Sequence, residues 1–322
     1  MTAVYITIDT EYSAGLTAEL GVQAREEVFD RSILCRTPDG EVGIVHQMDV
    51  MDAHDIKGVF FVDPMPAFVW GTGAVAAVVE PILERGHEVQ LHLHPEWLEL
   101  AGDANPLKTR TGRNLHEFTE TEQVDLLGLA RDQLIAAGAP SPSAFRAGNF
   151  GANDATLRAL RTVGIRYDSS HVPGIAVSDC RISLTQDDQA VVQHEGAIEV
   201  PVGSVASIGG QRHAQITALS HWELEAALRH CVSEKVEAFN IVSHSFELMS
   251  RDRTRSNRIL GRRFARFCRT LADISGADSA TFGSRPPQLG DETGAAAMQR
   301  NPIRSMARMA EQFVANRLYG AK

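Results

Sequence analysis

The sequence predicts an α/β fold in which parallel strands alternate with helices. Apolar runs suited to buried strands are followed by helical patterns along most of the 322 residues, and the chain, 43% hydrophobic, can bury a large core. Successive predicted strands also finish on ionisable residues, which core packing does not explain. In parallel α/β barrels the chemistry lies at the carboxyl ends of the strands, so this pattern predicts an enzyme. The strand-end residues are Asp9 and Glu11, Asp63, His92 and His94, Arg146, Asp168, and His244.

The first strand is predicted over residues 4–9, where apolar and polar residues alternate. Continuing the two-residue period places Glu11 on the same side as Asp9. Two carboxylates in this arrangement can share a metal ion, or one can bind the metal while the other acts as a base. The structural alternative is one acid in a turn followed by one acid at a helix start.

The strand that stops at Pro95 carries two histidines on one face. Alternation of apolar and polar residues puts His92 and His94 on the polar side, with Glu96 just beyond the strand. Imidazoles at this spacing can converge on one zinc or similar ion, and we favour this interpretation over a pair of half-buried, hydrogen-bonded histidines. His87 begins the same strand, far from this end, and is expected at the surface.

The other elements follow from apolar periodicity and from cap and turn residues. A capping box of Thr119 and Glu122 opens one helix, and Gly86 ends another. Residues 99–116 have no clean period and are expected to form a functional loop, and residues 172–220 are expected to be irregular and rich in strand. Further strands are predicted within 58–64, 143–151, 165–168, 197–202 and 238–244, and helices at 46–55, 74–85, 119–138, 155–163, 221–234, 257–274 and 301–318.

Cysteine usage and hydropathy predict a cytoplasmic protein. Cys35, Cys180, Cys231 and Cys268 are widely scattered and form no CxxC pair, which is typical of reduced thiols and not of a disulfide framework. No run approaches the ~18 apolar residues of a membrane-spanning helix. The N-terminus starts directly with a strand pattern, without the basic segment and cleavage site of a signal peptide.

The net charge of −10 is unevenly distributed. Residues 1–250 contain 17 Lys and Arg against 35 Asp and Glu, whereas residues 251–322 contain 14 against 6. The basic C-terminal quarter predicts a separate surface there. It does not predict a nucleic-acid-binding protein, because no nucleic-acid-binding motif accompanies it.

The motifs, taken together and in this order, resemble the NodB-type polysaccharide deacetylases of carbohydrate esterase family four. The resemblance covers roughly residues 3–275 and is closest to the branch associated with lipopolysaccharide biosynthesis. It is carried by the pair Asp9 and Glu11, the histidine cluster, the stretch Arg146-Ala-Gly-Asn-Phe, the stretch Tyr167-Asp-Ser-Ser, and the late strand-end His244.

This resemblance implies both a fold and an activity. The fold would be a distorted (β/α)7-type barrel with a C-terminal helical extension. The activity would be removal of N-acetyl groups from amino sugars of a surface polysaccharide or its precursor, with a divalent metal that is usually zinc. The alternative function is a catalytically silent glycan-binding protein on the same scaffold.

The resemblance also implies roles for individual residues. Asp9 matches the catalytic base, and Glu11 would be a metal ligand beside His92. The family's second motif has two histidines four residues apart; that spacing reaches Glu96 here, so the next ligand is either His94 or Glu96, and strand alternation favours His94. The other matches are Arg146, which would pair with the base, Asp168 in the fourth motif, and His244 as general acid.

The chain is expected to divide into a barrel at residues 1–283, a linker at 284–300 and an amphipathic helix within 301–322. The stripe of Ile303, Met306 and Phe313 on this helix could dock on a membrane surface. Packing on the barrel, or on a second copy of the chain in a homo-oligomer, is the favoured interpretation.

Overall fold

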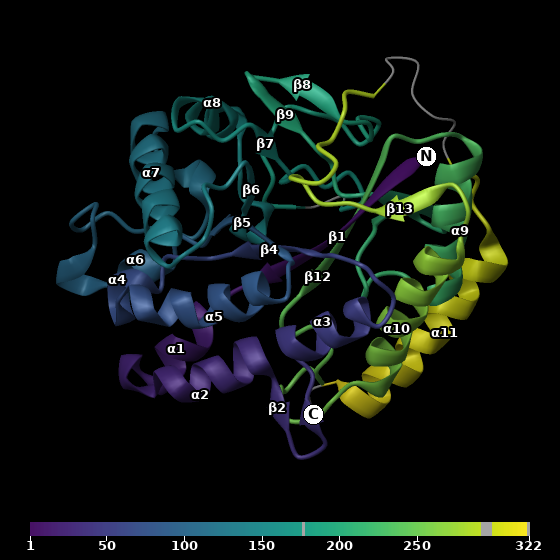
Figure 1. Cartoon of the computed structure of the whole chain (residues 1–322), viewed down its shortest axis with the longest axis horizontal. Helices are drawn as coiled ribbons and strands as arrows, with labels where there is room; N and C mark the ends of the chain where they lie inside the picture. The colour runs from purple at the N-terminus through teal and green to yellow at the C-terminus, as the bar shows by residue number, and fades with distance from the viewer. Residues whose placement is uncertain (176–177, 291–297, 321–322) are drawn as a thin grey trace.

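A curled, mostly parallel sheet forms the centre of the molecule (Figure 1). The computed structural model describes residues 1–175, 178–290 and 298–320. Seven consecutive strands of the sheet are parallel, which confirms the predicted α/β barrel-like fold. In spatial order they are β12 (Ala238–His244), β1 (Thr2–Thr10), β4 (Val59–Val62), β5 (Glu88–Leu93), β6 (Ala144–Ala147), β7 (Tyr167–Asp168) and β9 (Ala197–Glu199). β8 (Val192–His194) pairs antiparallel with β9, and β13 (Ala277–Ser279) pairs parallel with β1.

Helices surround this sheet, and two hairpins lie outside it (Figure 1). The α-helices are α1 (Ala14–Leu20), α2 (Arg25–Phe29), α3 (Ile44–Asp52), α4 (Ala67–Trp70), α5 (Thr72–Glu84), α6 (Trp97–Leu100), α7 (Glu120–Ala136), α8 (Asp154–Thr162), α9 (His221–Ser233), α10 (Arg258–Asp273) and α11 (Pro302–Tyr319). Shorter helical turns are η1 (Val22–Ala24), η2 (Asp30–Leu34), η3 (Gly102–Ala104), η4 (Leu115–Glu117) and η5 (Gly148–Phe150). The hairpins are β2 (Arg36–Thr37) with β3 (Gly40–Glu41), and β10 (Ser204–Ser207) with β11 (Gly210–His213).

The sheet separates two apolar cores, because successive side chains of a strand point to opposite faces. Ile6 and Ile8 of β1 belong to the larger core, which includes apolar residues of the surrounding helices. Tyr5 belongs to the smaller core, where the Phe282 ring lies 5.4 Å from the Tyr5 ring and 5.5 Å from that of Tyr167. Both cores are fully buried around β1, which holds the residues at its carboxyl end in fixed positions.

The predicted linker is only partly within the described residues. Its first part lies against the barrel: the Tyr5 hydroxyl donates to the Arg285 carbonyl at 2.6 Å, and the Gly290 amide donates to the Val191 carbonyl at 2.9 Å. Residues 291–297 lie outside the described residues. The barrel therefore uses the chain as far as Gly290, in addition to the predicted residues 1–283.

The expected surface position of His87 is wrong, whereas the expected packing of the C-terminal helix on the barrel is observed. His87 is 3% exposed, not a surface residue, because its ring packs edge-on to Phe60 and its Nδ1 accepts a hydrogen bond from the Gly58 amide at 3.0 Å. α11 does pack on the barrel, but through its polar side, so its apolar stripe is not the packing face. Residues 14–34 form helices for which no prediction was made.

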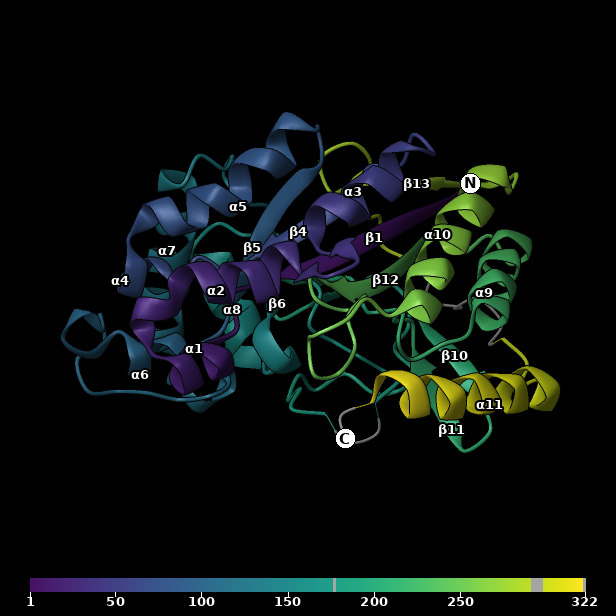
Figure 2. The ribbon, with the colours of Figure 1, turned by 90° about the horizontal axis from the view of Figure 1, so that it is seen from below.

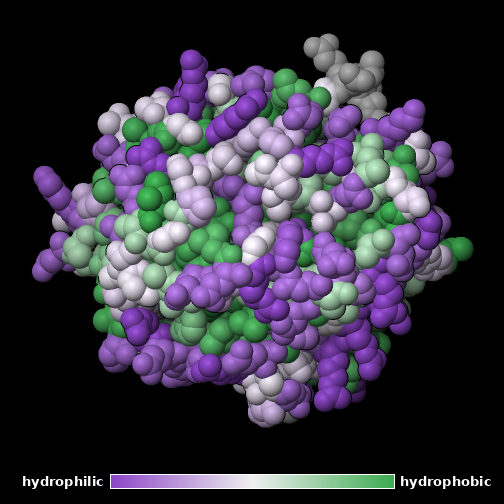
Figure 3. Space-filling view, viewed as in Figure 1, coloured by the Kyte–Doolittle hydropathy of each residue, from purple (hydrophilic) through white to green (hydrophobic). Residues whose placement is uncertain are grey.

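Polar and hydrophobic residues alternate over the visible face of the molecule (Figure 3). Hydrophobic residues on the face shown in Figure 3 form several small groups between polar ones. Within the described ranges, no helix combines the length and hydropathy needed to cross a bilayer.

Candidate metal centre and active site

The carboxyl ends of neighbouring strands bring the predicted site residues to one edge of the sheet. Asp9 on β1 lies opposite His244 on β12, and His92 on β5 lies opposite Arg146 on β6. Glu11 follows directly after β1. The period-two pattern and the parallel strand order together produce this arrangement.

Glu11, His92 and His94 form a cluster in which one potential ligand atom from each lies within 4.8 Å of the others. The Nε2 atom of His92 is 3.2 Å from Glu11 Oε2, and the Nε2 atom of His94 contacts the same oxygen. Their rings are nearly perpendicular, with centroids 4.9 Å apart. Two imidazole nitrogens and a carboxylate oxygen are a donor set that zinc accepts.

The opposite ring nitrogens already have partners, which leaves the Nε2 atoms free for a metal. His92 Nδ1 lies 2.7 Å from the Arg146 carbonyl, which can only accept, so Nδ1 donates. His94 Nδ1 lies 2.9 Å from Glu96 Oε2 and is oriented by that carboxylate. Metal-bound histidines usually have such a partner on the second nitrogen. Glu96 therefore lies on the far side of His94 from the cluster.

The electrostatics of the cluster also suit a cation. Burial opposes ionisation of Glu11, but the charge of His94 and the close approach of both histidines hold its pKa well below the usual range. Glu11 Oε2 is nevertheless buried without a well-oriented hydrogen bond from any described residue. A divalent ion between Glu11 and the two Nε2 lone pairs would satisfy this oxygen, so the residues fit the metal that the family resemblance implies.

Gly148 explains how the loop after β6 approaches the cluster so closely. A Cβ atom at this position would lie 2.6 Å from the His94 ring, which is closer than van der Waals contact allows. Only glycine fits there without displacing the imidazole.

Asp9 and Arg146 form a buried ion pair beside the cluster. The guanidinium NH1 lies 2.6 Å from Asp9 Oδ1, with side chains 0% and 4% exposed respectively. Arg146 is fixed by two 3.0 Å hydrogen bonds to Ser169 and stacks over the Phe61 ring at 4.4 Å. Burial alone would raise the pKa of Asp9, but the charge and hydrogen bond of Arg146, together with the charges of His92 and His244, outweigh it, so this pKa is lowered and Asp9 stays ionised.

His244 lies on the other side of Asp9 and is paired with Glu247, which was missing from the predicted site. His244 Nε2 is 3.9 Å from Asp9 Oδ2, and Nδ1 is 2.8 Å from Glu247 Oε2. Burial disfavours the imidazolium, but the hydrogen bond and charge of Glu247, together with the charges of Asp9 and Glu11, outweigh it and raise the pKa of His244 to about 9. His244 is therefore protonated at neutral pH. Glu247 sits in the turn after β12, so no strand periodicity reveals its direction.

Asp168 is fully buried, and its carboxylate is held by residues outside the cluster. It accepts hydrogen bonds from the Ser170 amide and hydroxyl at 2.9 Å, and it pairs with the buried carboxyl of Glu199. Burial raises the pKa of both acids, and Asp168 raises that of Glu199 further, so the pair shares a proton. The Ser170 hydroxyl accepts from the Ala147 amide, next to Arg146. Asp168 thus acts on the site through the strand that carries Arg146.

Asp63 is another strand-end acid, to which the sequence analysis gave no role in the site. It is 2% exposed, and its Oδ1 accepts from the Met65 amide at 3.0 Å. Burial raises its pKa to about 6, although the nearby His94 and His92 partly oppose this. Its Oδ2 is buried with no hydrogen-bond partner in the described chain.

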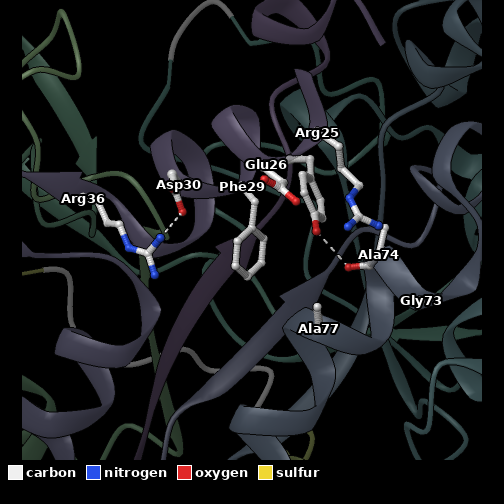
Figure 4. A pocket seen from close by; sticks show the side chains of 9 residues that line it. Arg25, Glu26, Phe29, Asp30, Arg36, Gly73, Ala74 and Ala77 are labelled. Carbon is white, nitrogen blue, oxygen red and sulfur yellow. Dashed lines mark hydrogen bonds and ion pairs between the residues drawn. The ribbon is translucent and has the colours of Figure 1, made fainter. Parts of the chain in front are cut away.

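One of two cavities is lined by residues of the candidate site, and the other is not. A cavity of about 630 Å³ is lined by His244, Glu247, Arg253 and residues from α10 and α11. Arg253 stacks over Phe246 at 4.1 Å and forms no ion pair with a described acid, so this cavity has a basic wall. A smaller cavity of about 260 Å³ lies between α2 and α5 and holds none of the predicted site residues (Figure 4).

Comparisons with known proteins support the fold. No family model and no curated protein matches the sequence. A proposed polysaccharide deacetylase from Mycobacterium smegmatis aligns with a TM-score of 0.56 and 14% identity, over 90% of this chain and 94% of that one. A family 4 carbohydrate esterase from Streptomyces lividans, in complex with acetate, aligns with a TM-score of 0.45 and 12% identity, over 92% and 98%. At these identities the likeness establishes a shared fold with the first of these structures.

Proposed function

We propose that the protein is a metal-dependent hydrolase that removes N-acetyl groups from amino sugars of a surface polysaccharide or its precursor. The observation that carries the proposal is the position of Asp9. This ionised carboxylate lies between the Glu11, His92 and His94 cluster on one side and the protonated His244 on the other. A base, an acid and a set of metal ligands at one edge are what amide hydrolysis needs.

Each residue has a distinct part in this reaction. A divalent metal such as zinc supplies Lewis acidity, which polarises the amide carbonyl and lowers the pKa of water. Glu11, His92 and His94 would hold it. Asp9 takes the proton of the attacking water, and Arg146 keeps Asp9 oriented through the 2.6 Å ion pair. His244 Nε2 gives its proton to the leaving amine, and Glu247 holds that imidazole through Nδ1.

The substrate class rests on the sequence motifs and is supported by the shared fold. We extend the proposal to an N-acetylated sugar of a lipopolysaccharide precursor, to zinc as the metal, and to a cytoplasmic site of action. The basic wall that Arg253 gives to the cavity beside His244 is compatible with an acidic or phosphorylated carrier of that sugar.

Acetate release from N-acetylglucosamine oligosaccharides tests this function. The wild-type protein with zinc should release acetate, and Asp9→Asn should lower the rate by ~10²–10⁴-fold with its metal content largely retained, because a general base contributes that much. Binding of the oligosaccharide without any acetate release, in protein that contains the metal, would favour the silent glycan-binding alternative. Loss of metal in Asp9→Asn would show that Asp9 is itself a ligand.

A further inference from the structure

α11 lies along the edge of the molecule beside β10 and β11 (Figure 2), and it packs on the barrel through polar side chains. Ser305 and Arg308 are its two buried residues, 1% and 4% exposed. Arg308 pairs with Glu223 of α9 at 3.2 Å, and the Ser305 hydroxyl lies 3.1 Å from that of Ser207 on β10. A buried ion pair and a buried hydroxyl pair fix this orientation of the helix, because turning it over would leave these polar groups without partners.

The other side of α11 is apolar and exposed. Thirteen large hydrophobic side chains are exposed in the described part of the chain, and six of them lie on this one helix, with 46% to 69% exposure. Ile208, 45% exposed, lies in the turn between β10 and β11, and its amide lies 3.4 Å from the Ser305 hydroxyl on the packed side of α11. Single exposed apolar residues are ordinary, but a continuous patch marks an interaction surface. The apolar face of α11 consists of Ile303, Met306, Met309, Phe313, Val314 and Leu318.

The charges around this face are positive. Arg300, Arg304 and Arg317 lie on or beside α11, and none of them forms an ion pair with a described residue. The single acid of the helix, Glu311, is turned towards the barrel, where it pairs with Arg263 at 2.7 Å. The helix therefore offers an apolar stripe flanked by arginines with no acid among them.

We propose that the apolar face of α11 docks the protein on an anionic lipid surface. An in-plane amphipathic helix inserts its apolar side at the level of the headgroups, where flanking arginines meet lipid phosphates. A second copy of the chain is a poorer occupant. A two-fold interface centred on this face would bring the two sets of arginines together, which like-charge repulsion opposes.

The position of the helix relates docking to the active site. Gln312, Asn316 and Tyr319 of α11 line the same cavity as His244 and Glu247. Docking through the opposite side of α11 would therefore bring this cavity within about one helix diameter of the lipid surface, with α11 between them. This inference is independent of the proposed deacetylation, because it concerns binding to lipid alone.

Vesicle cosedimentation of the full chain tests the proposal. The protein should sediment with vesicles of phosphatidylglycerol mixed with phosphatidylcholine and should bind phosphatidylcholine vesicles much more weakly, with the difference reduced at high salt. Phe313→Asp should weaken binding by ~10-fold or more, because it puts a charge on the inserted face. The matched control is Leu129→Asp on α7, an exposed apolar residue (36%) that should leave binding unchanged.

A second variant gives a positive signal that does not depend on loss of binding. Phe313→Trp should show a blue shift and increased intensity of tryptophan emission when phosphatidylglycerol vesicles are added. No sedimentation of the wild type, or equal effects of Phe313→Asp and Leu129→Asp, would overturn the proposal. So would a stable wild-type dimer that Phe313→Asp converts to monomer, because a second copy would then cover the face.

Discussion

Two groups of three potential metal ligands occur among the described residues, and they differ in what surrounds them. The first is Glu11, His92 and His94 at the edge of the sheet, where Glu11 Oε2 is buried and has no well-oriented donor. The histidines are held from behind by the Arg146 carbonyl and by Glu96. This group is fixed in place by other residues, and its ligand atoms contact one another.

The second group is Asp154, His194 and Glu195, which lies near the surface between α8 and β8. Its oxygens are already used by protein donors. Asp154 Oδ1 accepts from the Ser183 amide at 2.8 Å, and Glu195 Oε2 pairs with Arg158 at 2.8 Å. The two groups therefore differ in what a bound ion would require, namely a buried oxygen that no protein donor already uses and no competing cation.

The largest difference between the two regions should appear when an arginine is removed from each. Arg146→Met leaves Asp9 buried without its partner and should lower the free energy of unfolding by ~3–5 kcal/mol and abolish activity. Arg158→Met removes the exposed pairs with Glu120 and Glu195 and should cost less than ~1 kcal/mol. Chemical denaturation of both variants measures this. Similar losses of unfolding free energy in the two variants would mean that burial does not make the Asp9–Arg146 pair more important for stability than the exposed Arg158 pairs.

His244 should matter most for a poor leaving group. His244→Ala should slow cleavage of an N-acetyl sugar by ~10²–10⁴-fold, the usual contribution of a positioned proton donor. An activated aryl acetate needs little protonation of its leaving group and should lose far less. The rates on both substrates, together with a thermal melting curve of each protein, distinguish a proton-donor role from a structural role. Equal losses together with a lowered melting point would indicate a structural role for His244 only.

Glu96 should affect metal affinity without being a ligand. Glu96→Gln removes the carboxylate that orients His94 and should weaken zinc binding by ~10–100-fold, the usual effect of such partners. His94→Ala removes a ligand and should weaken binding more. Competition with a chelator of known affinity measures both. A larger effect at Glu96 than at His94 would make Glu96 the ligand, in line with the family's four-residue spacing.

The smallest of these effects should be a shift in pH dependence. Glu247, together with Asp9 and Glu11, raises the pKa of His244 to about 9, so wild-type activity should fall as pH rises through about 9, where the proton donor is lost. In Glu247→Gln the largest of these raising effects is absent, and this limb should move to lower pH. The raised pKa also contributes stability that is complete below the unfolded-state value of ~6.5 and is lost as pH rises through about 9. If the basic limb of the pH profile is unchanged in the variant, His244 is not the group whose titration causes it.

The sequence predicted those site residues whose positions depend on local periodicity, and it missed those that depend on contacts between distant elements. The faces of Glu11, His92 and His94 follow from period-two alternation, which is a property of each strand by itself. Glu247 and Glu199 approach the site from a turn and from a strand far along the chain, so no local pattern indicates them. For the same reason, the sequence did not indicate which side of α11 faces the barrel. Its hydrophobic stripe is visible in the sequence, but the partners of Arg308 and Ser305 come from α9 and β10.

The metal content of purified protein tests the central claim most directly. Elemental analysis of the wild type, His92→Ala and His194→Ala, purified in parallel with zinc, compares the two groups of ligands under the same conditions. The account predicts one divalent ion per chain in the wild type and in His194→Ala, and a loss of that ion in His92→Ala, with all three proteins folded. Equal metal content in the wild type and His92→Ala, or loss of the ion in His194→Ala, would contradict it.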